Sequence, residues 1–380
     1  MNTSLPYDRY QRQLILKGFG VAAQDKLRGS KVLVIGAGGL GCPILNYLTA
    51  AGVGHLGVAD HDKVSLSNLH RQILFDTNDI GKYKVDVVKG KLNALNPEVE
   101  IQTWRDQWTK QHCIDYFLEF DVIVDATDNF SSRYMINDAS VLLQKPLVFG
   151  AVSQYEGQVA VFNVKQDDGS FSVSYRDIFP VPPQDAEVLN CSEAGVLGVL
   201  PGVIGSMQAS EVIKLITGIG NPLVNKLWNY NVLNQSVCIM DLVPRKDNSG
   251  GMPLNLDQFL DTPYDVQCGL NVDHQNEINP DTWKESYMGN FLVDIREPYE
   301  QPRLNSLAES MNLKLIEIPL SELESRFAEV CDKNLVLVCQ AGKRSLHAVD
   351  LLSRMNINSV AYSLKGGVNG LVDLKWLSNE

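Results

Sequence analysis

Three glycines at the end of an apolar run could hold a phosphate group. The run KVLVI is followed by Gly36, Gly38 and Gly41 and then by a helix-like stretch, CPILNYLTAAG. Glycine has no Cβ atom, so a phosphate can approach the backbone closely, and the first N–H groups of a helix carry the positive end of its dipole. The pattern therefore predicts a nucleotide site, although a turn that only packs a helix on a strand would use the same residues.

Charged side chains downstream of this turn indicate which nucleotide is bound. Asp60 ends a second apolar run, about 20 residues beyond the turn, where a carboxylate can accept hydrogen bonds from a ribose. Micromolar binding of a triphosphate requires about 8 kcal/mol, whereas a helix N-terminus contributes about 0.3–1 kcal/mol to an anion. Arginine and lysine must therefore share the phosphates, and a carboxylate must hold the accompanying Mg²⁺. The candidates are Asn68, Arg71, Gln72 and Lys84 for the phosphates, and Asp125 and Asp128 for the edge where Mg²⁺ would lie, with Asp128 as its ligand.

A second reactive group is predicted at Cys339. It ends the apolar run NLVLVC and begins the loop CQAGKRS, in which Lys343 and Arg344 lead into a helix. Backbone N–H groups at a helix N-terminus and nearby cations lower the pKa of a thiol and favour a reactive thiolate. An inert cysteine at the end of a buried strand is the alternative interpretation. Cys331 lacks the helix N-terminus and the cations that surround Cys339.

The elements that must position these residues alternate between strands and helices. Strands are predicted at 31–35, 55–60, 100–104 and 121–125, with helices between them, which favours a mostly parallel sheet covered on both faces. The runs PLVFGAV and GQVAVFNV then predict antiparallel strands that continue the sheet, and VIGSMQASEVIKLITG predicts a long helix. The segment PRKDNSGGMP has the composition of a linker.

We therefore divide the chain into two α/β domains. Residues 1–245 form the first, 246–277 the linker, and 278–380 a smaller domain. Its predicted elements are the helix PDTWKESY, the strands FLVDI and NLVLVC, the helix RSLHAVDLLSRM and the strand SVAYSL. A length of 380 residues agrees with about two domains.

Composition excludes several classes of function. The net charge of −12 opposes binding to nucleic acid or anionic lipid. The most apolar late run, AGVLGVLPGVIG, is too short and too rich in glycine to span a membrane, and the N-terminus does not read as a signal peptide. Seven cysteines without close pairs predict reduced thiols. We expect a cytoplasmic enzyme with neither nucleic acid nor membrane as a partner.

Five motifs in order resemble the ubiquitin-activating-enzyme-like family, specifically the bacterial sulfur-carrier adenylyltransferases of molybdopterin and thiamine synthesis. They are RYQRQ, GAGGLG, DHDKVSLSNLHRQ, DATDN and CSEAGVLGVLPG, and they cover residues 7–242. The resemblance implies a Rossmann-like sheet and the adenylation, by ATP with Mg²⁺, of the C-terminal carboxylate of a small ubiquitin-like protein ending in Gly-Gly.

The resemblance also implies roles for individual residues. Asp60 would hold the ribose, Asp128 would hold Mg²⁺, and Arg12 would reach the ATP site of a neighbouring subunit, which implies a homodimer. Cys191 would capture an activated carboxylate or a sulfur relay intermediate. The expected nucleotide-binding set is Gly36, Gly38, Gly39, Gly41, Asp60, Asp62, Asn68, Arg71, Gln72, Lys84, Asp128 and Asn129.

The chain departs from this family at the zinc site. Most relatives carry two C-x-x-C pairs, whereas here the corresponding stretches read SYRD, at 174–177, and RKDNSGG, at 245–251. A structural zinc needs four ligands of the Cys or His type. We therefore expect no structural zinc and expect polar contacts near Arg176 and Asp177 instead.

The motif C-x-x-G-x-R-S, with VDIREPYE before it and LKGG after it, resembles a rhodanese domain over residues 278–377. The resemblance implies a persulfide on Cys339, stabilised by Arg344 and the loop amides, and a loop ordered by Asp294, Arg296 and Glu297. A sulfur donor such as a cysteine desulfurase would load it. The stretch between residues 300 and 318 lacks the family's usual histidine and Pro-Gly signature.

The combination predicts a carrier thiocarboxylate, made for molybdopterin or thiamine synthesis. In this hypothesis the Cys339 persulfide attacks the acyl adenylate, and Cys191 either resolves an acyl disulfide or forms a thioester. An NAD-dependent oxidoreductase would use the same glycine turn but would not need Arg71, Lys84 and Asp128. A carrier-binding scaffold without activity is the non-enzymatic alternative.

Overall fold

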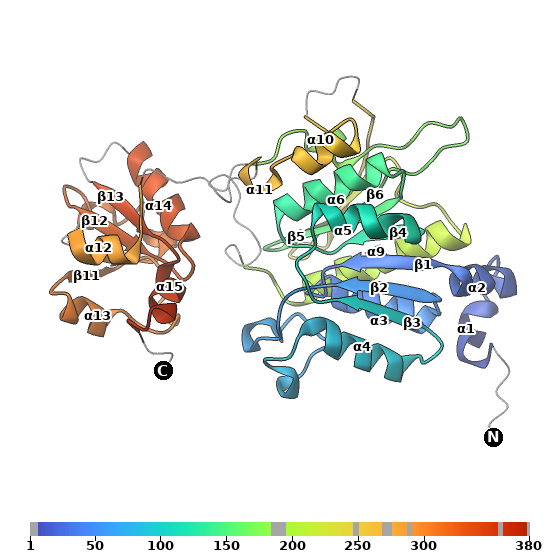
Figure 1. Ribbon diagram of the computed structural model, residues 1–380, viewed down its shortest axis with the longest axis horizontal. Helices are drawn as coiled ribbons and strands as arrows, with labels where there is room; N and C mark the ends of the chain where they lie inside the picture. Colours follow the sequence, from blue (N-terminus) through green and yellow to red (C-terminus); the bar gives the residue numbers. More distant parts are fainter. Residues whose placement is uncertain are drawn as a thin grey trace. The chain divides into compact units, whose positions relative to one another are not determined.

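The computed structural model describes residues 7–183, 195–245, 251–267, 276–286, 291–355 and 360–377. The chain forms two compact units (Figure 1). Among the described residues, the first unit holds 7–183, 195–245 and 251–267, and the second holds 276–286, 291–355 and 360–377. Each unit is described by itself.

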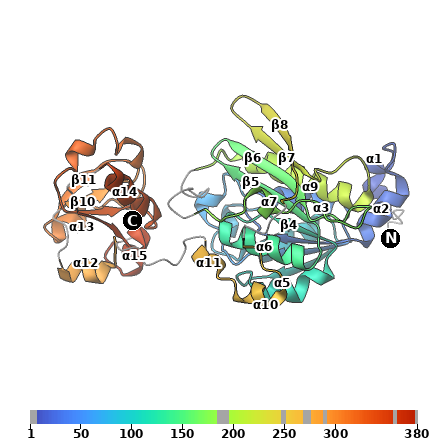
Figure 2. The ribbon, with the colours of Figure 1, turned by 90° about the horizontal axis from the view of Figure 1, so that it is seen from above.

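An 8-stranded sheet forms the centre of the first unit, with the strand order β3-β2-β1-β4-β5-β6-β7-β8. The first five strands of this order are parallel, and the last three extend the sheet in antiparallel fashion, with β8 at its edge (Figure 2). The predicted parallel sheet with an antiparallel extension is thus confirmed. The strands are β1 (Lys31–Ile35), β2 (His55–Ala59), β3 (Glu100–Trp104), β4 (Val122–Asp125), β5 (Leu147–Ser153), β6 (Glu156–Phe162), β7 (Lys226–Asn231) and β8 (Ser236–Asp241).

Helices cover both faces of this sheet because its central strands are apolar on both sides. In β1, Val32 and Val34 face one core while Leu33 and Ile35 face the other. The first face carries α2 (Gly20–Gly29), α3 (Gly41–Ala51), α4 (Lys84–Leu95) and α9 (Val199–Thr217), and the second carries α5 (Lys110–Tyr116), α6 (Phe130–Leu142) and α7 (Tyr175–Ile178). Short helical turns complete the unit: η1 (Asp8–Tyr10), α1 (Gln11–Leu14), η2 (Leu66–Asn68), η3 (Thr77–Asp79) and η4 (Phe117–Glu119).

Helix α9 is long and apolar enough to cross a membrane by length and composition alone. Its apolar side chains lie in the core, where Leu200, Ile204 and Val212 are fully buried. It packs on α3, β5 and β6. We therefore interpret α9 as a core helix, and its composition follows from burial between helix and sheet.

The segment predicted as a linker contains two helices that belong to the first unit. These are α10 (Leu256–Asp261) and α11 (Tyr264–Gln267), which pack against α5 and α6 (Figure 1). Phe259 and Tyr264 anchor them, because they are buried in the core that covers the second face of the sheet. The prediction of a linker over 246–277 was wrong for residues 256–267, which form these helices. Two aromatic residues set among polar ones do not show the periodicity of a helix in the sequence.

A buried carboxylate, Asp138, ties α11 to the rest of this unit. Its Oδ1 and Oδ2 accept hydrogen bonds of 2.7 and 2.8 Å from the guanidinium of Arg176. Its Oδ2 also accepts a bond of 2.8 Å from the hydroxyl of Tyr264. Burial, together with the charge of Asp138, raises the pKa of Tyr264, so this hydroxyl stays protonated and acts as a donor.

Replacing Tyr264 by phenylalanine should destabilise the first unit by about 1.5 kcal/mol, because the variant loses one hydrogen bond to a buried charged group. Urea unfolding followed by tryptophan fluorescence would measure the change. Tyr155→Phe is the matched control, since Tyr155 is 44% exposed. Equal midpoints for both variants would contradict the structural role of Tyr264.

The second unit contains a 5-stranded parallel sheet with the order β11-β10-β12-β13-β9 and a core on each face. Its strands are β9 (Glu277–Ile278), β10 (Phe291–Asp294), β11 (Lys314–Glu317), β12 (Leu335–Val338) and β13 (Ala361–Leu364). Its helices are α12 (Pro280–Ser286), α13 (Asn305–Ser310), η5 (Leu320–Glu322), η6 (Phe327–Glu329), α14 (Lys343–Arg354) and α15 (Gly367–Asp373). Strand β9 was not predicted, because its two residues are too few to show a period, and β11 was also missed.

Candidate nucleotide and sulfur-transfer sites

The glycine turn lies where the strand order of the large sheet reverses. From β1 the chain continues to β2 and β3 on one side, and then returns to β4 and β5 on the other. Ligands of open α/β sheets bind outside the carboxyl ends of the strands at such a point. Gly36 follows β1 here, and a Cβ atom added to it would lie 2.4 Å from the carbonyl oxygen of Ala126, just after β4. With φ of +103°, Gly36 allows the two loops to touch.

The other glycines of the turn differ in what they permit. A Cβ atom at Gly41 would lie 2.1 Å from the carbonyl oxygen of Gly36, so this glycine closes the turn at the start of α3. A Cβ atom added to Gly39 would lie 3.0 Å from the Cβ of Pro201, so Gly39 allows close packing against this proline. At Gly38 the nearest atom would be the amide nitrogen of Gln72, at 3.7 Å. Gly38 is therefore the position with most room for a ligand.

Lys84 is buried against two aspartates beside this turn. Its Nζ lies 2.8 Å from Oδ2 of Asp62 and 3.8 Å from Oδ2 of Asp60, and the lysine side chain is only 4% exposed. Asp60 also accepts hydrogen bonds of 2.8 Å from the backbone N–H groups of Ala37 and Asp62. Burial raises the pKa of Asp60, against the opposing effect of Lys84. This arrangement argues against a solvated helix face for Lys84 and places a cation at the glycine turn.

The predicted phosphate ligands after β2 are held together by one amide. Oδ1 of Asn68 accepts hydrogen bonds from Arg71, at 3.2 Å, and from Gln72, at 2.7 Å. Gln72 is 3% exposed, and its Oε1 has no hydrogen-bond partner among the described residues. Buried polar atoms are almost always satisfied, so this oxygen is a position where a ligand can bind.

The loop after β4 is organised by a fully buried carboxylate. Oδ1 of Asp125 accepts hydrogen bonds from the backbone N–H of Thr127, at 2.9 Å, and from its hydroxyl, at 2.6 Å. Nε of Arg133 lies 3.6 Å from the second oxygen of Asp125. Arg133 was not predicted as a site residue, because its position inside a helix gave no signal. Asp125 therefore fixes the loop that presents Asp128.

Asp128 and Asn129 have different surroundings in this loop. The side chain of Asp128 is exposed. Oδ1 of Asn129 instead accepts a hydrogen bond of 2.8 Å from the backbone N–H of Ser132 and caps α6. Asn129 was predicted to bind the nucleotide, but its carbonyl oxygen is occupied by this cap.

Two predicted residues stand apart from this cluster. Cys191 lies outside the described residues. Arg12 is exposed on α1, which packs on α2, and α2 leads directly into the start of β1. Helix α1, which carries Arg12, is therefore at the amino edge of the sheet, whereas the glycine turn follows β1 at the carboxyl edge.

The two stretches that would carry zinc ligands in related proteins are joined by a carboxylate. Oδ2 of Asp177 accepts hydrogen bonds from the backbone N–H of Ser174, at 2.7 Å, and from its hydroxyl, at 2.9 Å. Oδ1 of Asp177 accepts a bond of 2.6 Å from the backbone N–H of Arg245. These residues offer no thiolate or imidazole, and both oxygens of the carboxylate are used. They do not fit a tetrahedral zinc site.

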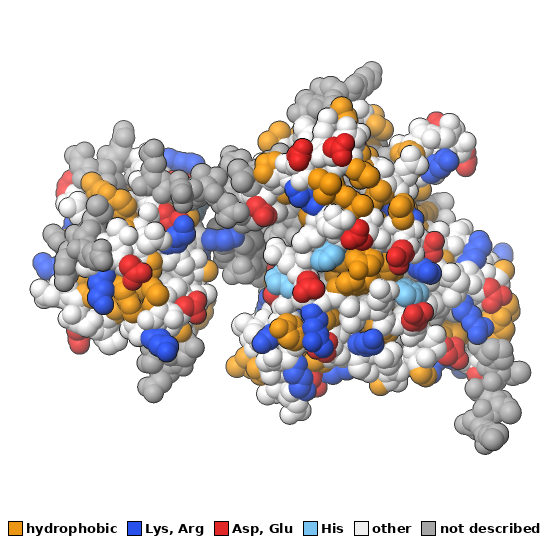
Figure 3. Space-filling model, viewed as in Figure 1, with side chains coloured by type: hydrophobic (Ala, Val, Ile, Leu, Met, Phe, Trp, Pro, Cys, Tyr) orange, Lys and Arg blue, Asp and Glu red, His pale blue; other side chains and the backbone are white. Residues whose placement is uncertain are grey.

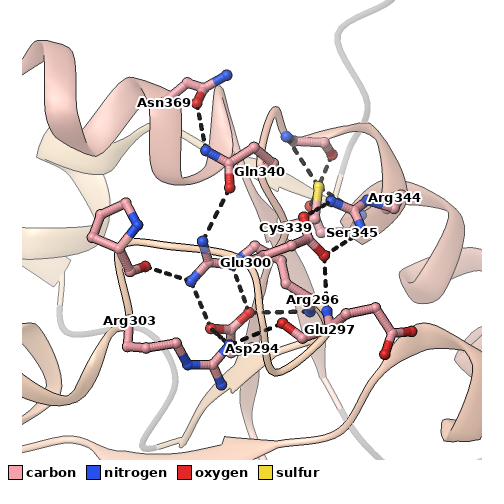
Figure 4. Close-up of polar contacts among 12 residues, drawn as sticks. Asp294, Arg296, Glu297, Glu300, Arg303, Cys339, Gln340, Arg344, Ser345 and Asn369 are labelled. Carbon is pink, nitrogen blue, oxygen red and sulfur yellow. Dashed lines mark hydrogen bonds and ion pairs between the residues drawn. The ribbon is translucent and has the colours of Figure 1, made fainter. Parts of the chain in front are cut away.

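In the second unit, Cys339 follows β12 and its sulfur faces the start of α14 (Figure 4). The residue is 1% exposed. Its Sγ accepts hydrogen bonds from the backbone N–H groups of Gly342, at 3.1 Å, and Ser345, at 3.4 Å. The loop amides predicted around Cys339 are present, and its burial at the end of β12 also fits the alternative of a buried strand-end cysteine. The reactivity of Cys339 therefore stays a prediction.

Glycines of two segments allow this loop to close. A Cβ atom at Gly342, whose φ is +92°, would lie 2.9 Å from the backbone nitrogen of Gly366. A Cβ atom at Gly367 would lie 2.2 Å from the carbonyl oxygen of Cys339. The backbone N–H of Val368 donates a hydrogen bond of 2.9 Å to that same oxygen. The LKGG motif therefore packs directly against the cysteine loop.

A chain of hydrogen bonds connects β10 to the same loop (Figure 4). The guanidinium of Arg296 lies 2.8 Å from Oδ2 of Asp294, and both side chains are fully buried. Arg296 also donates a bond of 3.0 Å to Oε1 of Gln340, whose amide donates one of 2.7 Å to Asn369. The expected ordering of the loop by Asp294 and Arg296 agrees with these contacts.

Glu300 takes the place that the prediction gave to Glu297. Oε1 of Glu297 accepts a hydrogen bond of 3.4 Å from the hydroxyl of Ser321. Glu300 instead binds both terminal nitrogens of Arg344, at 2.9 and 2.5 Å. The predicted role of Arg344 in stabilising a persulfide stays a prediction, and the structure adds a carboxylate that pairs with it. Glu300 was not predicted as a site residue, because it lies at the start of the stretch that lacks the usual rhodanese motif.

Comparison with known proteins agrees with both sites. Residues 10–251 match the model of the ThiF family, and residues 275–373 match the Rhodanese-like domain. The chain is 48% identical over 265 residues to a sulfur carrier protein adenylyltransferase of Thermus thermophilus, covering 69% of this chain and 97% of that protein. It is 36% identical over 370 residues to a probable adenylyltransferase/sulfurtransferase, MoeZ, of Mycobacterium tuberculosis, covering 95% and 91%.

Solved structures support the fold of the first unit. A crystal structure of E. coli MccB with ATP matches with a TM-score of 0.54 at 22% identity, over 63% of this chain and 73% of that one. The family matches cover both units, and each falls on residues that form one of the two sites described above. The chain therefore belongs to the ThiF family and carries a C-terminal rhodanese-like domain.

Proposed function

We propose that this chain converts the C-terminal carboxylate of a ubiquitin-like sulfur carrier ending in Gly-Gly into a thiocarboxylate. The observation that carries the proposal is the presence of both sites in one chain: a buried lysine at a glycine turn, and a cysteine sulfur held by loop amides. Relatives named for sulfur carrier adenylylation and for adenylyl and sulfur transfer support it.

In the first step, a carboxylate oxygen of the carrier attacks the α-phosphorus of ATP. The bond to the β,γ-phosphates breaks, and pyrophosphate leaves with the electron pair. Arg71 and Lys84 would neutralise the phosphates, and Asp60 would accept hydrogen bonds from the ribose. When Mg²⁺ is bound with ATP, it supplies a further positive charge at the phosphates, and Asp128 would hold it.

In the second step, a persulfide on Cys339 would attack the carbonyl carbon of the acyl adenylate, and AMP would leave. The product is an acyl disulfide that joins the carrier to Cys339. In one version of the next step, the thiolate of Cys191 attacks the sulfur of Cys339 in this acyl disulfide, and the carrier thiocarboxylate leaves. The resulting disulfide between Cys191 and Cys339 is then reduced by a dithiol reductant. In the other, Cys191 captures the acyl group as a thioester before sulfur transfer.

We propose further that the active form is a homodimer in which Arg12 serves the partner's nucleotide site. Apolar side chains around α1 support this, since Ile15, Leu16 and Tyr47 are 74%, 57% and 57% exposed. A second subunit could bury them.

We also propose that Asp177 holds Ser174 and Arg245 together where related proteins use zinc. A donor such as a cysteine desulfurase would load Cys339. The product would serve molybdopterin or thiamine synthesis in the cytoplasm.

Nucleic acid is not part of this proposal. Lys and Arg side chains are mixed with Asp and Glu on the face drawn in Figure 3, and among its coloured side chains no extended basic stripe is visible. A net charge of −12 agrees with a protein or nucleotide substrate better than with a phosphate backbone.

The proposal is tested by ATP–pyrophosphate exchange with the full chain, Mg²⁺ and candidate carriers added one at a time. We expect one carrier to stimulate exchange, and we expect the same carrier without its two terminal glycines to do nothing. Exchange that does not depend on any carrier would contradict the proposal. Competition by NAD for the ATP site would favour the oxidoreductase alternative instead.

A further inference from the structure

Arg344, which follows the cysteine loop, is paired with a carboxylate from another part of the second unit. Both terminal nitrogens of Arg344 bind Glu300, at 2.9 and 2.5 Å, and each side chain is 19% exposed. The backbone N–H of Glu297 donates a further bond of 2.8 Å to Oε2 of Glu300. Burial raises the pKa of Glu300, but the hydrogen bonds from Arg344 and Glu297 outweigh it and hold the pKa below its ordinary value. Glu300 is therefore ionised at neutral pH.

This pairing changes what a sulfur donor meets at the loop. The sulfur of Cys339 is contacted by the backbone N–H groups of Gly342 and Ser345, which are dipoles without net charge. The side-chain charge of Arg344 is matched by that of Glu300 in a two-pronged ion pair (Figure 4). The geometry of such pairs is specific, and the two opposite charges largely cancel. A third charged group nearby therefore experiences little net electrostatic attraction from the pair.

Donors of sulfur differ in the charge that they bring. With thiosulfate, the thiolate of Cys339 attacks the outer sulfur, the S–S bond breaks, and sulfite leaves with the electron pair. With an organic persulfide, the thiolate attacks the outer sulfur and an organic thiolate leaves. Both reactions yield the Cys339 persulfide, but the first brings a small dianion to the loop.

We propose that Glu300 is a specificity-determining residue that disfavours small dianionic sulfur donors at Cys339 and so favours persulfide groups carried by a protein. The inference rests on the proposed role of Cys339 and adds a donor class to it. Glu300 acts through Arg344, because its carboxylate cancels a charge that would otherwise attract the dianion.

The test measures thiocyanate formation from two donors, with cyanide as the acceptor and the full chain as the enzyme. Thiosulfate carries two charges and methanethiosulfonate carries one. For Glu300→Gln we expect kcat/KM to rise about tenfold with thiosulfate and about threefold with methanethiosulfonate, because a freed cation attracts in proportion to charge. The rise with thiosulfate should disappear at high salt, which screens the interaction.

Two further variants separate the charge effect from a structural one. Glu322→Gln is the matched control: it removes the same charge from the second unit, where Glu322 pairs with Arg326 at 2.9 Å, and it should leave both donors unchanged. The double variant Glu300→Gln with Arg344→Gln should lose the gain with thiosulfate, since the guanidinium whose charge Glu300 balances is gone. Equal changes with both donors, or a gain that survives in the double variant, would overturn the proposal.

Wild-type protein provides a test that needs no variant. Its kcat/KM with thiosulfate should show little fall as the salt concentration rises, because the charge of Arg344 is already paired with Glu300. A steep fall would mean that Arg344 attracts the dianion, and Glu300 would then have no role in selection. Cys339→Ala should form no thiocyanate from either donor; if it does, the proposed role of Cys339 fails, whatever the result for Glu300.

Discussion

Replacing Asp128 by alanine should reduce carrier-dependent ATP–pyrophosphate exchange by about 10²- to 10³-fold, the loss seen when one preorganised electrostatic contact to a transition state is removed. Asp128 is exposed on the loop that Asp125 fixes with its hydrogen bonds to Thr127. Without its carboxylate, the metal ion that accompanies the triphosphate would lose its protein ligand. Exchange measured with labelled pyrophosphate at saturating ATP would show the loss.

Asp106→Ala is a suitable control, since Asp106 is also an exposed aspartate of the first unit. It should keep full exchange activity. Normal exchange by the Asp128 variant would contradict its assignment as the metal ligand.

Mixing the Asp128 variant with Arg12→Ala extends the test to the proposed dimer. If Arg12 acts in the partner's site, each variant alone is inactive, but half of all dimers would be mixed, and each mixed dimer would have one of its two sites with both the arginine and the aspartate intact. We expect a return to about one quarter of the wild-type rate, from the statistics of random pairing in a two-fold dimer. No recovery after subunit exchange would contradict a role for Arg12 across subunits.

Replacing Cys339 by alanine should leave carrier-dependent exchange unchanged and abolish thiocarboxylate formation. The two steps use different units, and the sulfur of Cys339 forms its hydrogen bonds with the loop amides and the hydroxyl of Ser345, all within the second unit. Exchange would be measured with labelled pyrophosphate, and thiocarboxylate by mass spectrometry of the carrier.

Cys331→Ala is the matched control for this prediction. The side chain of Asp332 raises the pKa of Cys331, so Cys331 is a poor nucleophile near neutral pH. It should retain both activities. Thiocarboxylate formation by the Cys339 variant, with sulfur supplied through the second unit, would refute the proposed sulfur path.

Local pattern was enough to predict the parts of the fold where composition and period agree. The β-branched run of β1, the glycines after it and the apolar start of α3 belong to one continuous stretch, so the strand, turn and helix could be predicted together. The two helices over 256–267 could not, because their packing depends on two buried aromatic residues that are set among polar neighbours.

The same contrast holds within the sites. Asp60 and Lys84 were found because each follows or begins a predictable element, and the structure brings them together. Glu300 was missed because it meets Arg344 across 44 positions of the chain, and Asp177 reaches Arg245 across 68. Contacts of that range depend on the packed fold, which no local period encodes.

The central claim is tested most directly by incubating the full chain with ATP, Mg²⁺, a sulfur-loaded donor and a Gly-Gly carrier, and then measuring the intact mass of the carrier. The account predicts a mass increase equal to the exchange of one oxygen for one sulfur, which requires ATP and Cys339. A carrier that is adenylated but never gains sulfur, or that gains it equally well with Cys339→Ala, would contradict the account.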